Sequence, residues 1–535
     1  MDNIDIHNII LYMKMIRLKK DSFYIYALIG ICLIFLLLKL EFLNPKVVWD
    51  ESVYLGMGKH IYSGGSSGLW EMIRPLGLPL VTGFFWKIGL NQIIASRIFS
   101  IMISLGCIIA AYLIAKELFD KKHALISALI MACTPIFFLY SDYILTDHIS
   151  TLFLMLSILF LLKDRAIVGG IFGGLAFWFK FTSILYIIAL MLFIIYKFIR
   201  YKFIRTMIKN KTSIWQAISS KEIKKYLYVT AIIVLFVGAY FFSNYLLYKA
   251  HFGAIDAIFK PYLDAAAYSN NPYQNTVVNS IHSLIYYIFY YPYNIIFNHA
   301  YGSLIYVFLL IYFIRCSTFV KNKLNESHIL MLFVFFTYLV HFSIIPYKVD
   351  RFWITFLPFM AIYSSFGIFW LMNNNKLWKS NRHSKYPRII VITIVIILFG
   401  MTLYKDSQIY ESNRWNKINT ESIVSDKTDN NVETYFDTHN IQGPILVTNP
   451  MFAAYSDKRY IGAYDVLNKN GLFVNDWEAN INFNAVAYMD SSIPCLETDT
   501  RCVVNKEKLK DMITTNFRKT DSYVYDGVDV TFYMK

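Results

Sequence analysis

Repeated apolar runs, each long enough to cross a lipid bilayer, restrict the fold of this sequence more than any other feature. The first run covers residues 25–43, and the last ends at Leu403. Inside a bilayer, only helices and closed barrels satisfy every backbone N–H and C=O group. The chain is 56% hydrophobic and only 16% charged, whereas soluble domains carry about 25% charged residues. We therefore predict a polytopic α-helical membrane protein with roughly eleven transmembrane helices, counted from apolar windows of spanning length.

The basic residues predict how the chain is oriented. The formal net charge is +15, and Lys and Arg gather in alternate loops, as they do on the cytoplasmic side of membrane proteins. The pattern places the N-terminus in the cytoplasm and the residues after the last span outside. The first apolar run lacks a following small-residue cleavage site, so we expect it to be retained as a span. No nucleic-acid-binding signature accompanies the charge, and we exclude nucleic acid as a partner.

A change in composition divides the chain into two expected domains. Residues 1–404 form the transmembrane domain, and residues 405–535 are polar enough for a small extracytoplasmic α/β domain. In this tail, residues 445–448 and 485–488 have the pattern of buried strands, and residues 506–517 that of a helix. Residues 522–525 and 528–533 flank Asp526-Gly527, a dipeptide typical of hairpin turns.

Two adjacent carboxylates, Asp50 and Glu51, follow the first span directly. Such groups are costly in contact with lipid, but at the mouth of a water-filled cavity one of them could act as a base. The alternative is that they only begin a solvated loop. We expect residues 44–90 to form a long outer loop, in which residues 53–62 form a helix along the membrane interface. The second span should begin at residues 74–79 and end near Leu118.

The other prominent charges also lie at the outer ends of the predicted spans, whereas the span interiors hold almost none. Pumps and carriers place ionisable residues along a path through the middle of the membrane. The distribution therefore favours a reaction site at the outer leaflet over a transporter or flippase of lipid-linked saccharides. A non-catalytic receptor is the third possibility, which the mixture of acids and cations disfavours. These charges are Asp50, Glu51, Arg74, Asp142, Asp147, Lys180, Lys348, Asp350 and Arg351.

A series of short motifs contains these charges, in order and on one face: Trp49-Asp50-Glu51-x-x-Tyr54, Arg74-Pro75-x-x-x-Pro79, Thr146-Asp147, Gly174-Leu175-Ala176-x-x-x-Lys180 and Asp350-Arg351-Phe352-x-x-x-Phe356-Leu357-Pro358. The set resembles the GT-C superfamily of membrane glycosyltransferases, in the branch of protein O-mannosyltransferases and the lipid A aminoarabinose transferase. The resemblance covers about the first 360 residues, and the tail resembles family tails only in placement. The Trp-Trp-Asp signature of oligosaccharyltransferases is missing, which argues against block transfer of oligosaccharides.

The resemblance implies transfer of a sugar from a polyprenyl-phosphate carrier, dolichyl or undecaprenyl phosphate, to an acceptor hydroxyl on a protein, lipid or glycan outside the cytoplasm. Among the acids, Asp50 is the candidate base, with Glu51 and Asp147 as further catalytic candidates. The candidates for binding the donor phosphate are Arg351 first, then Lys180, Arg74 and Lys348.

Each of these candidates has a structural alternative. Glu51 could only orient Asp50 or pair with a cation. Asp147 could cap the fourth helix, and Lys180 and Arg74 could extend to lipid headgroups. Lys348 fits a headgroup contact better than a catalytic role.

We expect no cofactor, because the histidines near the outer face lack the spacing of metal ligands. A divalent metal stays open, since the oligosaccharyltransferases of the superfamily use one. Cys495 and Cys502 are separated by a short polar segment of the tail. Oxidising compartments favour disulfides, and so short a loop can close when the two Cα atoms come within about 7 Å. We hypothesise a disulfide between them.

Overall fold

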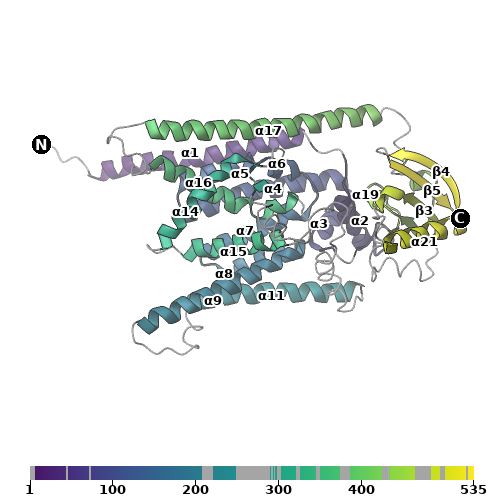
Figure 1. Ribbon diagram of the computed structural model, residues 1–535, viewed down its shortest axis with the longest axis horizontal. Coiled ribbons are helices and arrows are strands. Elements are labelled where there is room, and N and C mark those ends of the chain that lie inside the picture. The colour runs from purple at the N-terminus through teal and green to yellow at the C-terminus, as the bar shows by residue number, and fades with distance from the viewer. Residues whose placement is uncertain are drawn as a thin grey trace.

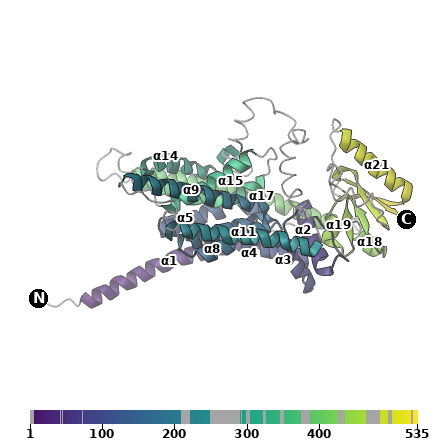
Figure 2. The same ribbon diagram turned by 90° about the horizontal axis from the view of Figure 1, so that it is seen from below.

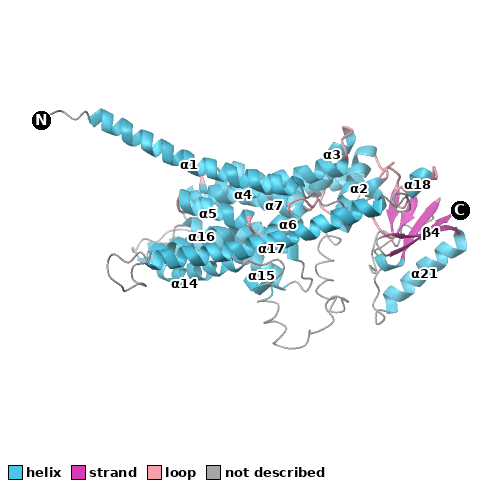
Figure 3. Cartoon of the chain, turned by 90° about the horizontal axis from the view of Figure 1, so that it is seen from above, coloured by secondary structure: helices cyan, strands magenta, loops and turns pink. Residues whose placement is uncertain are grey.

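The computed structural model shows an elongated bundle of helices with a small sheet at one end, opposite the N-terminus (Figures 1 and 3). The bundle helices run mostly along the long axis, and α1 extends beyond the others at the N-terminal end (Figure 2). The structure describes residues 6–41, 43, 46–71, 74–207, 221–248, 290, 293–294, 296–297, 303–320, 326–344, 350–373, 386–424, 432, 434–463, 483–493, 500–525 and 528–535.

Each expected membrane span coincides with one or more helices. Within the described residues, six segments are long and apolar enough to cross a membrane: 22–41, 92–118, 181–200, 223–243, 326–343 and 389–408. The chain is therefore a multi-pass membrane protein. The bundle helices are α1 (Ile6–Glu41), α4 (Gln92–Leu118), α5 (Lys121–Ala132), α6 (Pro135–Tyr140), α7 (Thr146–Leu162), α8 (Ala166–Phe179), α9 (Ile184–Met207), α11 (Lys221–Tyr248), α14 (Phe308–Val320), α15 (Glu326–Ile344), α16 (Leu357–Asn373) and α17 (Tyr386–Val424). Four 3-10 helices are also described: η1 (Phe181–Ser183), η3 (Leu304–Val307), η4 (Asp350–Thr355) and η6 (Asp490–Ser492).

The prediction of one continuous second span was wrong. Helix α3 (Gly77–Lys87) ends before α4 begins. Between them Gly89 has a φ of 80°, a conformation that ends a helix and that glycine adopts without strain. Asn91 then caps α4, because its side chain accepts a hydrogen bond from the Ile94 N–H at 3.0 Å. The third span is likewise divided, with Pro135 as the first residue of α6.

Helix α2 (Trp49–Ser63) is present where a helix was expected, and its place along the membrane interface stays a prediction. Its residues from Glu51 to Lys59 are all buried. It packs closely on α3, since a Cβ atom on Gly58 would lie 2.6 Å from the backbone nitrogen of Gly83. Helix α2 is therefore enclosed by protein.

The C-terminal sheet has the strand order β2-β1-β3-β5-β4. Strand β1 (Ile445–Val447) is parallel to β2 (Tyr460–Gly462) and β3 (Ala485–Met489), whereas β5 (Val528–Met534) is antiparallel to β3 and β4 (Arg518–Tyr525). The predicted strands are confirmed, as is the antiparallel pairing of the two that flank residues 526–527. The predicted turn at Asp526-Gly527 itself lies outside the described residues. Strand β2, of three residues, was not predicted.

Alternation along the strands gives the sheet two apolar faces. Helix α21 (Thr500–Asn516) covers one face, where Leu509 and Ile513 pack on Leu446 and Val486. Helices α18 (Tyr435–Thr438) and α19 (Met451–Tyr455) cover the other. The core of this second face also contains Leu69, from the segment between α2 and α3.

Helix α17 is longer than the predicted last span, residues 389–403, and continues to Val424. The expected boundary between residues 404 and 405 therefore lies inside a helix. Its apolar segment, residues 389–408, is followed by a polar extension that the change in composition had assigned to the tail.

The predicted orientation can be tested by cysteine labelling. In a variant with Cys495 and Cys502 replaced by Ser, Thr514→Cys on the exposed face of α21 should react with an impermeant thiol reagent added to intact cells. The matched control is Lys122→Cys, an exposed position in the first turn of α5, which should react only after permeabilisation. If only Lys122→Cys were labelled in intact cells, the protein would have the opposite orientation to the predicted one.

Candidate active site

Asp50, in the first turn of α2, is bound by two arginines from distant parts of the chain. Its Oδ1 atom is 2.8 Å from Arg74 Nη2, and its Oδ2 atom is 2.5 Å from Arg351 Nη1. Arg74 precedes α3, and Arg351 lies in η4. Burial by itself raises the pKa of Asp50, but the two guanidinium groups outweigh burial and lower the pKa to about 2. Asp50 is therefore an anion held between two cations.

Arg351 also joins Asp50 to a second acid. Asp147, in the first turn of α7, accepts a hydrogen bond from Lys180 Nζ at 2.5 Å. Its Oδ2 atom is 4.0 Å from Arg351 Nε. Burial by itself lowers the pKa of Arg351, but the neighbouring carboxylates raise it, so the guanidinium stays charged. The acids and cations, which come from five separate segments, thus form one cluster.

Aromatic rings and one further acid complete the surroundings. The Lys180 ammonium lies 5.0 Å from the centre of the Phe352 ring, a cation–π distance. Glu71, which sequence reasoning missed, accepts a hydrogen bond from Arg74 Nε at 2.9 Å. With Glu71 counted, three carboxylates face three cations. An anionic ligand would therefore compete with these carboxylates for the arginines.

Two structural alternatives from the sequence can now be compared with the contacts. Asp147 is not the N-cap of α7, a position occupied by Leu145, and its carboxylate binds Lys180. Lys180 and Arg74 direct their charges to acids of the cluster. Lys348, Cys495 and the side chain of Cys502 lie outside the described residues, so their predicted roles stay predictions.

Glu51 lies next to Asp50 in sequence but has a different environment. Its side chain is completely buried. One carboxylate oxygen accepts the Ile144 N–H at 2.7 Å, and the other accepts the Val48 N–H at 2.8 Å and contacts Arg97 Nη2 at 3.4 Å. These are the contacts of an anchor, because they tie the start of α2 to the segment that leads into Asp147. The alternative interpretation of Glu51, as a group that orients Asp50, agrees with this geometry.

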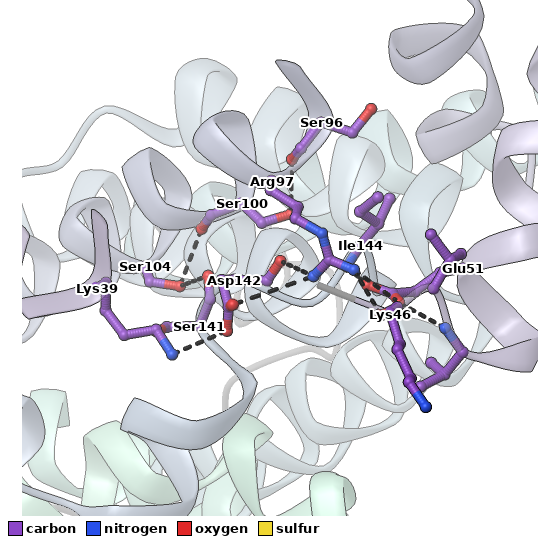
Figure 4. A network of polar contacts seen from close by, with 12 residues as sticks. Lys39, Lys46, Glu51, Ser96, Arg97, Ser100, Ser104, Ser141, Asp142 and Ile144 are labelled. Carbon is purple, nitrogen blue, oxygen red and sulfur yellow. Dashed lines mark hydrogen bonds and ion pairs between the residues drawn. The ribbon is translucent and has the colours of Figure 1, made fainter. Parts of the chain in front are cut away.

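Glu51 ends a row of four buried charges of alternating sign (Figure 4). Lys39 Nζ of α1 is 2.8 Å from Asp142 Oδ1, and Asp142 Oδ2 is 4.0 Å from Arg97 Nη1 of α4. Arg97 also donates to the Lys46 carbonyl at 2.8 Å. The row joins α1, α2, α4 and the α6–α7 connection behind the candidate site.

The expectation that span interiors lack charge missed Lys39 and Arg97, which lie within two of the apolar segments. Their side chains are 0% and 2% exposed. An ionisable residue inside a membrane segment is expensive and usually has a partner. That rule, applied to each residue separately, would have found both.

The carboxylates of the cluster do not fit a divalent metal, because cationic side chains already bind Asp50 and Asp147. In the part of the chain that the structure describes, no group of three or more His, Cys, Asp or Glu side chains is placed to hold a metal ion.

Comparison with known proteins gives one family match. The model of the dolichyl-phosphate-mannose-protein mannosyltransferase family matches residues 73–237, which is less than half of the chain. This region includes Arg74, Asp147 and Lys180, and it excludes Asp50 and Arg351. A search of curated proteins by sequence finds no significant match.

Solved structures share the fold over nearly the whole chain. The oligosaccharyltransferase AglB from Archaeoglobus fulgidus, in complex with an inhibitory peptide and a dolichol-phosphate, has a TM-score of 0.55 and 12% identity over 96% of this chain and 74% of its own. ArnT from Cupriavidus metallidurans in the apo state has a TM-score of 0.55 and 11% identity over 96% and 98%. ArnT bound to undecaprenyl phosphate has a TM-score of 0.54 and 9% identity over 94% and 97%.

The anchoring role of Glu51 can be tested by Glu51→Gln. The amide replaces one oxygen acceptor with an N–H donor that would face another donor, and it leaves Arg97 with Asp142, at 4.0 Å, in place of two acidic neighbours. Breaking a buried ion pair costs about 3–5 kcal/mol, so the free energy of unfolding should fall by about that amount. Thermal unfolding of the purified protein in detergent should show a clearly lower Tm.

The control for this prediction is Glu117→Gln. Glu117 is exposed and pairs with Lys163 at 3.4 Å, and such surface pairs contribute at most about 1 kcal/mol. Equal midpoints for Glu51→Gln and Glu117→Gln would contradict an anchoring role.

Proposed function

We propose that this chain, a multi-pass membrane protein with the GT-C glycosyltransferase fold, transfers a sugar from a polyprenyl-phosphate carrier to an acceptor hydroxyl. The observation that carries the proposal is the position of Asp50, between Arg74 and Arg351 and beside the Asp147–Lys180 pair. Similar structures hold dolichol-phosphate or undecaprenyl phosphate, and the family match points to the same class of donor.

The cations of the cluster are suited to a phosphate leaving group. A guanidinium binds a phosphate through two parallel hydrogen bonds, and preorganised cations stabilise charge that develops in a water-poor site. We assign Arg351 as the main phosphate ligand, because it lies between both acids, and Lys180 and Arg74 as its neighbours. Lys348 is a further phosphate contact on the basis of its place in the sequence, three residues before Arg351.

Asp50 is assigned as the general base. The acceptor oxygen attacks the anomeric carbon of the sugar, its proton passes to Asp50, and the bond from that carbon to the phosphate oxygen breaks with its electron pair on the polyprenyl phosphate. A pKa of about 2 is too low for a base that works near neutral pH. A phosphate that occupies the two arginines removes the interactions that lower this pKa. Donor binding therefore makes Asp50 a stronger base.

The other two acids support this arrangement. Asp147 holds Arg351 and Lys180 at the positions where the phosphate would bind. Glu51 fixes the start of α2 and so the direction of the Asp50 carboxylate. In this proposal the site faces the outside of the plasma membrane, the N-terminus is cytoplasmic, and the C-terminal domain is extracytoplasmic. The acceptor is a protein, lipid or glycan hydroxyl.

Asp50→Asn tests the base directly. General-base catalysis contributes typically 10²–10⁴-fold, so turnover should fall by about that factor while the protein still folds. Donor affinity should stay the same or rise, because the carboxylate that competes with the phosphate for Arg74 and Arg351 loses its charge. The measurement is the transfer rate from a labelled polyprenyl-phosphate sugar and the binding of that donor, both with purified protein in detergent. Turnover near that of the unchanged protein would show that Asp50 is not the base.

Arg351→Ala should behave differently from Asp50→Asn. The donor carries its phosphate in the ground state and in the transition state, so loss of Arg351 weakens donor binding as well as turnover. Arg165→Ala is the control, an exposed arginine at the other end of α8 from Lys180, and it should leave both quantities unchanged. Arg351→Ala with unaltered donor affinity would remove Arg351 from the phosphate site, and a transporter would show neither effect on transfer.

A further inference from the structure

Helix α2 is held at its far end by Lys59, whose side chain reaches into the C-terminal domain. The ammonium donates to the carbonyl oxygens of Ala454 at 3.0 Å and Ser456 at 2.9 Å. It also pairs with the Asp457 carboxylate at 3.1 Å. Lys59 is only 3% exposed, and a buried ammonium is costly unless it is paired and hydrogen-bonded. All of these oxygens come from the C-terminal domain, so Lys59 is satisfied only when that domain is docked.

The backbone around Lys59 fits the C-terminal domain closely. A Cβ atom on Gly56 would lie 2.7 Å from the Cβ atom of Ala453, so α2 and α19 touch without space for a side chain. Past the end of α2, Gly68 forms a parallel bridge with Arg459, and its carbonyl accepts the Tyr460 N–H at 2.8 Å. The segment after α2 therefore extends the β2 edge of the sheet.

Lys59 and Asp50 belong to the same helix. Nine residues at 1.5 Å each separate them by about 13–14 Å along the axis. Glu51 fixes one end of this helix to the membrane bundle, and Lys59 fixes the other to the C-terminal domain. Without Lys59, α2 would keep its attachment at Glu51 and its packing on α3 but would lose its attachment to the C-terminal domain. A tilt of α2 then shifts the first-turn carboxylate relative to arginines that lie on other segments.

We propose that Lys59 is a positioning residue, through which the docked C-terminal domain sets the tilt of α2 and holds Asp50 in line with Arg74 and Arg351. This inference rests on the proposed function of Asp50. Arg351 and Lys180 are held by Asp147, independently of Lys59, so the donor phosphate keeps these ligands when α2 tilts. Loss of Lys59 therefore lowers kcat and leaves donor affinity nearly unchanged.

The first experiment is Lys59→Met, which keeps the length of the side chain and removes its charge. A misplacement of about 1 Å can cost 10²-fold in rate, so we expect kcat to fall by about 10–100-fold with donor KM changed by less than about threefold. The control is Lys458→Met. Lys458 lies beside Asp457, but its side chain pairs with Asp437 inside the C-terminal domain, and its removal should leave kcat unchanged.

A second test changes the packing between Gly56 and Ala453 and leaves the charge of Lys59 in place. It also covers the case in which Lys59→Met does not fold. Gly56→Ala puts a methyl group against Ala453 and should push the C-terminal domain away from α2. Ala453→Gly removes the opposing Cβ atom. The double variant should therefore recover the kcat that Gly56→Ala loses. Failure of the double variant to recover any kcat would contradict the importance of this contact.

Hydrogen–deuterium exchange supplies a readout that does not depend on activity. In Lys59→Met and in Gly56→Ala, the backbone amides of α2 should exchange faster, whereas those of α7 should not change. Unaltered exchange in α2 would overturn the inference. So would full kcat in Lys59→Met in a protein whose turnover is abolished by Asp50→Asn. If Asp50→Asn itself retains turnover, the proposed function fails instead, and α2 exchange still reports whether Lys59 holds the helix.

Discussion

The arrangement of the candidate site depends on the hydrogen bonds and the ion pair that the buried carboxylate of Glu51 forms. Its two oxygens bind the backbone at the start of α2, the backbone just before α7 and the guanidinium of Arg97. A carboxylate removed from water needs these partners, because an unpaired buried charge costs several kcal/mol. Through its hydrogen bonds to the Val48 and Ile144 N–H groups, Glu51 brings together the two helix starts that carry Asp50 and Asp147. The residue next to the candidate base thus shapes the site without belonging to its surface.

The acids and cations near Asp50 are paired with one another, and this pairing affects how a donor phosphate could bind. Each arginine near Asp50 already has a carboxylate partner in the structure. In the proposed function, a donor phosphate exchanges one anion for another at these arginines, so that no bare cation has to be desolvated when the donor binds. The same exchange would free Asp50 from the charges that suppress its basicity. Under this proposal, donor binding and activation of the base are one event, and the acceptor is deprotonated only once the donor is in place.

The sequence predicted the membrane class, the order of the spans and most of the C-terminal sheet, because apolar length, loop charge and strand alternation are local signals. It also located Asp50, Asp147, Lys180 and Arg351 on one face, and the structure brings these four together. The break at Gly89 was missed, because one glycine and one capping asparagine hardly change the hydropathy of a long apolar run. Lys59 was missed for another reason, because its partners lie almost 400 residues away in the C-terminal domain and leave no pattern along the chain. Glu71 and Arg97 were missed although local rules point to them, since Glu71 pairs with Arg74 three residues later and Arg97 lies within an apolar segment.

The burial of Leu69 in the core of the C-terminal sheet bears on the order in which the protein is made. Ribosomes add about 5–20 residues per second, so the partner strands of Leu69 emerge roughly 20–80 s after it does. During that time, the remaining helices enter the membrane. The loop that carries Asp50 and Lys59 cannot yet pack against the C-terminal sheet, because the sheet has not been synthesised. Docking of this loop on the sheet is therefore a late step of biogenesis. It joins residues far apart in the sequence, and such closures are slow and exposed to aggregation. A truncated chain that inserts all its helices would still lack this last step.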